Sequence, residues 1–135
     1  MIKTANSEEE QRIAGILEKH LRNFPLAEES HRIQVMNRQN NISVAYLTTK
    51  SNLRFDQRHF DLQIEGSECY IVTFGVDQSR KRQGFGKALY QVVENFTREL
   101  GIKKILTDPS GEGKMFWPKM GLEKYDSANS LQKLI

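Results

Sequence analysis

The sequence contains a single cysteine, Cys69, so no disulfide can form within the chain. Cys69 lies in an apolar stretch, and we expect it to pack in the core rather than act as a nucleophile. Cysteine and histidine are nowhere grouped at the spacing of metal ligands, so we expect no metal.

Long apolar runs are absent too. No stretch is long enough to span a bilayer, and the first ten residues lack the apolar core of a signal peptide. We therefore expect a cytoplasmic protein that does not enter a membrane. The net charge is only +3, much of it at residues 80–82, which does not by itself predict binding to nucleic acid. The 135 residues suffice for one domain, residues 1–135, with a proper core.

The clearest pattern lies at residues 68–100. Residues 69–76 read as a strand in which both faces carry apolar or small residues, which predicts that the strand is covered on both sides. Residues 85–100 then carry an apolar stripe at helical spacing, and Gly101 follows as a helix stop. The stripe consists of Phe85, Ala88, Leu89, Val92, Val93, Phe96 and Leu100.

The turn between this strand and this helix is suited to an anion. Gly84 and Gly86 let backbone N–H groups approach a ligand, and the first N–H groups of a helix lack internal partners. Phosphate or diphosphate is therefore the expected guest. The dinucleotide fingerprint fails at Leu89, and the nucleotide P-loop fails at Lys81 and Ala88. From the turn alone, an alternative stays open: a tight turn whose basic residues are solvated and bind no ligand.

Further elements follow from the same rules. Ser7 to Glu10 forms a capping box, which predicts a helix that stops before Pro25. Residues 58–65 alternate, so we expect a strand with Phe60 inward and His59 outward. The other expected elements are strands at 32–36, 42–48 and 103–108, a helix at 114–120, and weak strands at 122–126 and 131–135.

Two motifs resemble the GNAT superfamily of N-acetyltransferases. Lys81-Arg82-Gln83-Gly84-Phe85-Gly86 is similar to its cofactor-binding motif, and Phe116-Trp117-Pro118-Lys119-Met120-Gly121-Leu122 resembles its second landmark. The resemblance covers residues 68–135. It implies an α/β (α+β) fold, a mostly antiparallel twisted sheet flanked by helices. Residues 2–4 alone could supply the family's first strand, so we expect that edge to be shortened or missing.

The resemblance also implies a reaction and a cofactor. The chain would move an acetyl group from acetyl-coenzyme A directly to a primary amine. The pantetheine arm would lie between residues 74–76 and residues 106–108, with a bulge at Gly75 and the N–H of Val76 facing the thioester oxygen. The cofactor-binding residues would be Phe74, Gly75, Val76, Lys81, Arg82, Gln83, Gly84, Phe85, Gly86, Lys87, Ser110, Phe116 and Trp117.

The sequence departs from the family where protons are handled. Trp117 stands at the place of the usual acidic tyrosine, and Ser110 at the place of a frequent asparagine. Indole cannot donate a proton at useful acidity, so Ser110 and Tyr125 are the alternative acids. Three further candidates each have a structural alternative. Glu68 is either a catalytic base or a solvated hairpin residue, and Tyr90 is either an acid or a core residue. His59 is either a catalytic residue or an exposed histidine. A thiolate can also leave unaided.

Three functions stay open. The first is the acetyltransferase, with a small amine, a peptide or protein, or an aminoacyl-RNA as acceptor. The second is a degenerate GNAT-fold protein that keeps coenzyme A as a structural or sensing ligand. The third is a small basic nucleic-acid or regulatory protein, which predicts salt-dependent binding to nucleic acid. A homodimer is an open alternative in each case.

Overall fold

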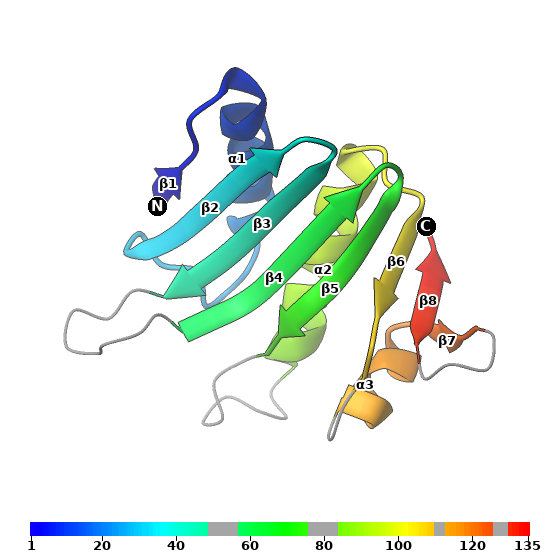
Figure 1. The fold of residues 1–135 in the computed structure, drawn as a ribbon. Coiled ribbons are helices and arrows are strands. Elements are labelled where there is room, and N and C mark those ends of the chain that lie inside the picture. The colour runs from blue at the N-terminus through cyan, green and yellow to red at the C-terminus, as the bar shows by residue number, and fades with distance from the viewer. Residues whose placement is uncertain (49–56, 76–83, 110–112, 126–129) are drawn as a thin grey trace.

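The computed structural model describes residues 1–48, 57–75, 84–109, 113–125 and 130–135. The described residues form an eight-stranded sheet in the order β1-β2-β3-β4-β5-β6-β8-β7, with three helices (Figure 1). The elements are β1 Ile2–Thr4, α1 Glu8–Leu21, β2 His31–Arg38, β3 Asn41–Thr48, β4 Gln57–Glu65, β5 Glu68–Phe74, α2 Phe85–Glu99, β6 Lys104–Thr107, α3 Gly113–Lys119, β7 Glu123–Lys124 and β8 Leu131–Leu134. Only the β1–β2 and β5–β6 pairs are parallel, so the predicted mostly antiparallel sheet is confirmed.

The first helix begins at the predicted capping box. The N–H of Glu10 donates to the Ser7 hydroxyl at 3.1 Å, and the Glu10 carboxylate accepts from the N–H of Ser7 at 2.9 Å. Its second oxygen accepts from the N–H of Asn37 at 2.7 Å. Glu10 therefore joins the start of α1 to β2. Residues 2–4 do form the edge strand β1, so that edge is short but not missing.

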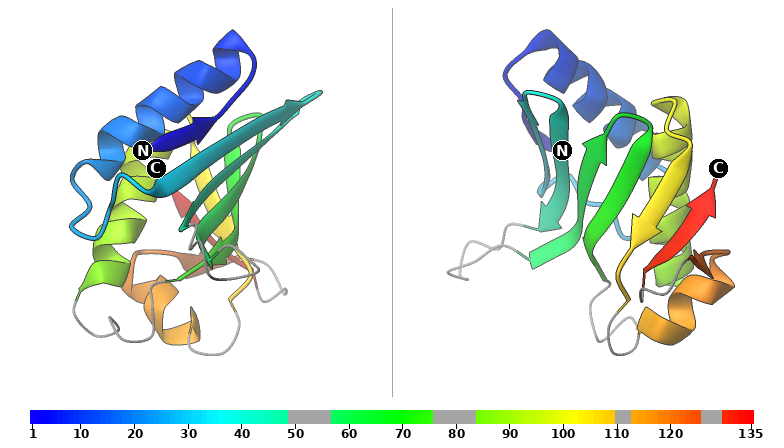
Figure 2. Two further views of the ribbon diagram at one scale, coloured as in Figure 1. Left: turned by 90° about the vertical axis from the view of Figure 1, so that its left-hand side faces the viewer. Right: turned by 45° about the vertical axis from the view of Figure 1, so that its right-hand side comes forward.

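Helices α1 and α2 cover one face of the sheet (Figure 2). The apolar stripe predicted for α2 is confirmed, because Leu89, Val93 and Phe96 are fully buried against the sheet. Lys19 of α1 and Glu99 of α2 form an ion pair at 2.6 Å where the two helices meet. No helix in the described part of the chain is long and apolar enough to cross a bilayer.

Strand β5 is covered on one face only, which corrects the sequence prediction. Cys69 and Ile71 are buried toward the helices, whereas the side chain of Val72 is 52% exposed and Thr73 is exposed. The apolar run on β5 therefore reflects strand propensity more than burial. The face of the sheet away from α1 and α2 carries no helix among the described residues, and we call it the open face (Figure 2).

His59 is buried, and the expectation of an exposed histidine was wrong. The register between β3 and β4 shifts at this point, because Tyr46 pairs with Phe60 while Leu47 pairs with Arg58. His59 is thus the extra residue of a β-bulge, which breaks the alternation of inward and outward side chains. Its ring lies 4.7 Å from that of Tyr46, and Nε2 lies 2.5 Å from the Thr48 hydroxyl.

Candidate active site

A gap opens between β5 and β6, as the sequence led us to expect. The ladder that joins these strands ends at Ile71 and Thr107, but β5 stays paired with β4 as far as Phe74 (Figure 1). Leu106 pairs with Tyr70, so Phe74 and Gly75 do not face residues 106–108 as predicted, and Val76 lies outside the described residues. The gap begins where β6 ends, and its β5 side is formed by residues 72–75.

The bulge in β5 lies at Val72 and not at Gly75. Ile71 pairs with Leu62 and Thr73 pairs with Asp61, which leaves Val72 as the extra residue. Gly75 continues the ladder, since its N–H donates to the carbonyl oxygen of His59 at 2.9 Å. A Cβ at Gly75 would meet nothing within 4 Å, so this position needs no glycine for space.

The backbone of Phe74 points into the gap. Successive residues of an antiparallel strand direct their N–H and C=O groups alternately to either side. Because the N–H of Gly75 points toward β4, the N–H and C=O of Phe74 point toward the side of β6. No strand lies opposite them among the described residues, so these two groups have no ladder partner in the part of the chain that the structure describes.

Three side-chain hydrogen bonds hold the closed end of the gap. On the helix side, the buried Thr107 hydroxyl donates to the carbonyl oxygen of Ile71 at 3.1 Å. On the open face, the Tyr70 hydroxyl donates to the carboxylate of Asp108, which also accepts from the Ser130 hydroxyl. These bonds lower the pKa of Asp108, the bond from Ser130 most. The bond to Asp108 also raises the pKa of Tyr70 to about 12.

The first turn of α2 is free to receive an anion. Gly84 is the N-cap residue with φ +81°, so no side chain caps the helix, and the first turn carries no acidic residue. In α1, by contrast, a serine caps the first turn and three glutamates occupy it. Within the described residues of this turn, no acidic side chain offsets the positive end of the α2 dipole, and Lys87 adds an exposed cation there. This turn lies at the end of β5 where the gap opens (Figure 1).

Aromatic side chains form the wall on the helix side of the gap. Phe74 stacks on Phe116 with ring centroids 5.5 Å apart, and Trp117 meets Phe74 edge-on at 5.1 Å. Trp117 is only 5% exposed and also packs against Tyr90 of α2. Phe74 and Phe116 are half-buried, so they keep surface for a ligand.

The glycines of the motif that resembles the GNAT cofactor-binding motif lie at the uncapped first turn of α2, beside the gap. The model of the acetyltransferase (GNAT) family matches residues 5–115. The chain belongs to the GNAT family of acetyltransferases. The resemblance seen in the sequence is thereby confirmed.

Two solved structures, each with a TM-score above 0.5, show the same fold at low sequence identity. An acetyltransferase from Bacillus cereus is 17% identical, with a TM-score of 0.55, over 96% of this chain and 94% of that one. Tetrahymena GCN5 is 11% identical, with a TM-score of 0.51, over 96% and 90%. A coenzyme A complex of an N-acetyltransferase from Thermoplasma acidophilum is 12% identical, with a TM-score of 0.49, over 71% and 62%. No curated protein is significantly similar in sequence.

The GNAT fold brings together only some of the predicted site residues. Phe74, Gly75, Gly84, Phe85, Gly86, Lys87, Phe116 and Trp117 lie around the gap and the first turn of α2. Val76, Lys81, Arg82, Gln83 and Ser110 lie outside the described residues. Tyr125 follows β7, half-buried, and lies near enough to Tyr70 to contribute to its raised pKa.

Two further predicted groups lie away from Phe74 and already have partners. Glu68 begins β5, six residues and about 20 Å from Phe74, where it is exposed and ion-paired with Lys104 at 3.5 Å. Tyr90 is fully buried, and burial raises its pKa while its hydroxyl donates to Glu94. Glu68 is thus a solvated residue beside the hairpin turn, and Tyr90 is a core residue. Both positions agree with the structural alternatives given for these residues. Burial also raises the pKa of Cys69 to about 12, consistent with a packing role.

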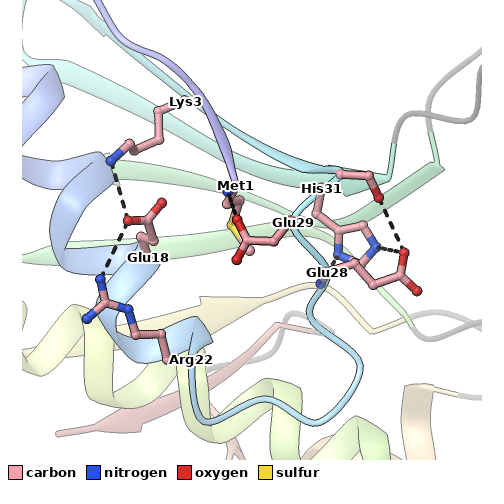
Figure 3. A network of polar contacts seen from close by, with 8 residues as sticks. Met1, Lys3, Glu18, Arg22, Glu28, Glu29 and His31 are labelled. Atoms are coloured by element: carbon pink, nitrogen blue, oxygen red, sulfur yellow. Dashed lines mark hydrogen bonds and ion pairs between the residues drawn. The ribbon is translucent and has the colours of Figure 1, made fainter.

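A hollow of about 430 Å³ lies between Met1, the end of α1 and residues 22–29. Its carboxylates already have partners (Figure 3): Glu18 bonds Lys3 and Arg22, and Glu29 bonds the amino group of Met1. Glu28 lies beside His31 in the same network. These ion pairs join β1 to α1 and Met1 to the loop that follows α1. We therefore interpret the charged residues around the hollow as structural.

Sequence reasoning overlooked the side chains at the closed end of the gap. Thr107 and Asp108 lie at or just beyond the carboxyl end of β6, and Tyr70 lies beside them in the parallel strand β5. That position was the available signal. Ser130 had none, because only the antiparallel pairing of β6 with β8 brings it beside Asp108.

Proposed function

We propose that this protein transfers an acetyl group from acetyl-coenzyme A directly to a primary amine. The observation that carries the proposal is the gap between β5 and β6, which opens beside the uncapped first turn of α2. A GNAT reaction needs an extended amide-rich arm and a diphosphate to be held at once. The open strand edge suits the first and the helix turn suits the second.

The residues present fit the cofactor. Gly84 has open space where a Cβ would lie, and the first turn of α2 has neither a capping side chain nor an acidic residue to compete with a diphosphate. The N–H groups of Phe85, Gly86 and Lys87 would hold the diphosphate, and the edge of β5 at Phe74 would hold the amides of the pantetheine arm. Acetyl-coenzyme A supplies the acetyl group as an activated thioester.

We propose that the N–H of Phe74 binds the thioester oxygen, because this group points into the gap. A donor fixed in advance stabilises the negative charge that develops on that oxygen. Val76, the residue first expected in this role, lies outside the described residues. Val76 therefore stays a second proposed donor beside Phe74.

The described side chains around the gap offer no strong proton acceptor or donor. The pKa of Asp108 is lowered and that of Tyr70 is raised to about 12, so at neutral pH one is a weak base and the other a weak acid. We propose that the amine loses its proton to solvent before it attacks. The rate should then rise with pH as the free amine increases. Ser110 and Tyr125 remain the proposed acids for the leaving thiolate.

A second candidate is a GNAT-fold protein that binds coenzyme A without catalysis. The burial of Trp117 at the position of the usual acid favours it. Two measurements separate the candidates: calorimetry with acetyl-coenzyme A and coenzyme A, then thiol release against a panel of primary amines. Binding with thiol release supports the enzyme, and binding without release supports the second candidate. Absence of binding rejects both.

A further inference from the structure

The closed end of the gap presents a carboxylate on the open face of the sheet. Tyr70 alternates with the buried Cys69 and Ile71, so its side chain faces away from the helices. Asp108, directly after β6, accepts the Tyr70 hydroxyl on one oxygen and the Ser130 hydroxyl on the other. Tyr70 within β5 and Ser130 just before β8 therefore fix this carboxylate beside the last residue pair that joins β5 to β6.

This carboxylate differs from the other acids on the same face. Asp61 pairs with Arg58 at 2.9 Å, and Glu68 pairs with Lys104 at 3.5 Å. Among the described residues, no lysine, arginine or histidine forms an ion pair with Asp108. An ionised carboxylate has about four acceptor sites, so two hydroxyl donors leave room for a further donor. Asp108 is exposed, so that donor can arrive from solvent.

We propose that Asp108, held in place by Tyr70 and Ser130, binds the ammonium group of the acceptor on the open face of the sheet. This inference rests on the proposed function and names its substrate class: an alkylammonium without a carboxylate near the amine. An amine that carries a neighbouring carboxylate would bring a like charge to Asp108 and bind more weakly.

The site can be tested by direct binding, with or without turnover. In full-length protein, with and without excess coenzyme A, the side-chain carboxyl carbon of Asp108 and the ring carbon that bears the Tyr70 hydroxyl are followed by carbon-13 NMR. The probe is n-butylammonium, and neutral n-butanol and zwitterionic glycine are the comparison probes. We expect n-butylammonium to shift both signals to saturation, and the other two to bind at least tenfold more weakly.

The variants compare a free carboxylate with a paired one. Asp108→Asn should weaken n-butylammonium at least tenfold, judged by the Tyr70 signal. Asp61→Asn, which removes an acid already paired with Arg58, should change the affinity less than twofold. Tyr70→Phe keeps the carboxylate but loses one holding bond, so we expect a three- to tenfold loss, judged by the Asp108 signal. This variant keeps the inference testable if Asp108→Asn does not fold.

The outcomes distinguish the inference from the function on which it rests. Unmoved signals with n-butylammonium, equal shifts with n-butanol, or full affinity in Asp108→Asn would each overturn the ammonium site, whether or not acetyl-coenzyme A binds. If coenzyme A fails to bind in calorimetry while n-butylammonium still binds through Asp108, the acetyltransferase proposal falls and the ammonium site stands.

Discussion

The hydroxyl of Thr107 donates to the carbonyl oxygen of Ile71 across the last residue pair that joins β5 to β6. This bond lies where the two parallel strands part, so we expect it to fix the position of the gap. Thr107→Val is nearly isosteric and removes the donor. It should lower the free energy of unfolding by about 1–2 kcal/mol in urea titrations, and weaken acetyl-coenzyme A in calorimetry.

The matched control is Thr107→Ser, which keeps the hydroxyl. It should restore most of the cofactor affinity that the valine variant loses. An unchanged affinity in Thr107→Val would show that the gap does not depend on this bond.

Gly84 offers a test of the diphosphate site. Gly84 has φ +81°, so a residue with a side chain is strained there. Asparagine and aspartate tolerate this left-handed conformation best among the residues other than glycine. Gly84→Asp places a negative charge at the first turn of α2 and should abolish binding of acetyl-coenzyme A. Gly84→Asn has the same shape without the charge and should lose affinity only about tenfold or less. Calorimetric affinities that agree between the two variants would contradict an anion site at this turn.

Trp117 should support packing and not proton transfer. It is buried edge-on against Phe74 and Tyr90. Trp117→Phe should lower the free energy of unfolding by about 1–2 kcal/mol, yet leave the rate of thiol release at saturating amine within about threefold, because indole donates no proton. Tyr90→Phe, which removes a buried phenol bonded to Glu94, should leave that rate equally unchanged. A tenfold fall in either variant with normal cofactor affinity would return that residue to the chemistry.

The sequence predicted the elements well where local chemistry determines them. The capping box of Ser7 and Glu10, the stripe of α2 and the glycine at its start each act within a few residues, so their patterns can be read directly. The family motif then supplied the gap between β5 and β6. These were also the features that identified the fold.

The predictions that were wrong concern side chains whose direction depends on the register between two strands. The bulges at His59 and Val72 each depend on how one strand pairs with its neighbour, and one extra residue reverses the facing of a side chain. Nothing within residues 58–65 or 68–74 marks those extra residues. The bond between Tyr70 and Asp108 likewise joins residues 38 positions apart, which only the parallel pairing of β5 with β6 brings together.

Glu10 should account for part of the acid sensitivity of the fold. Hydrogen bonds from the N–H groups of Ser7, Asn37 and Asn6 lower its pKa to about 2 in the folded protein, from an ordinary value of 4.5. A carboxylate whose folded pKa is depressed stabilises the protein above its unfolded pKa, and this contribution is lost as the pH falls from about 4.5 toward 2. Glu10→Gln should therefore lower the urea midpoint at pH 7, and its difference from the wild-type midpoint should shrink below pH 4.5.

The control for this prediction is Glu9→Gln on the same turn of α1. Among the described residues, Glu9 pairs only with the exposed Arg12, at 2.8 Å, and bonds to no other element. Exposed pairs of this kind contribute little to stability, so this variant should move the urea midpoint far less than Glu10→Gln at pH 7. If both variants moved the midpoint equally, the effect would come from charge at the helix start. The link from Glu10 to the N–H of Asn37 in β2 would then contribute nothing of its own.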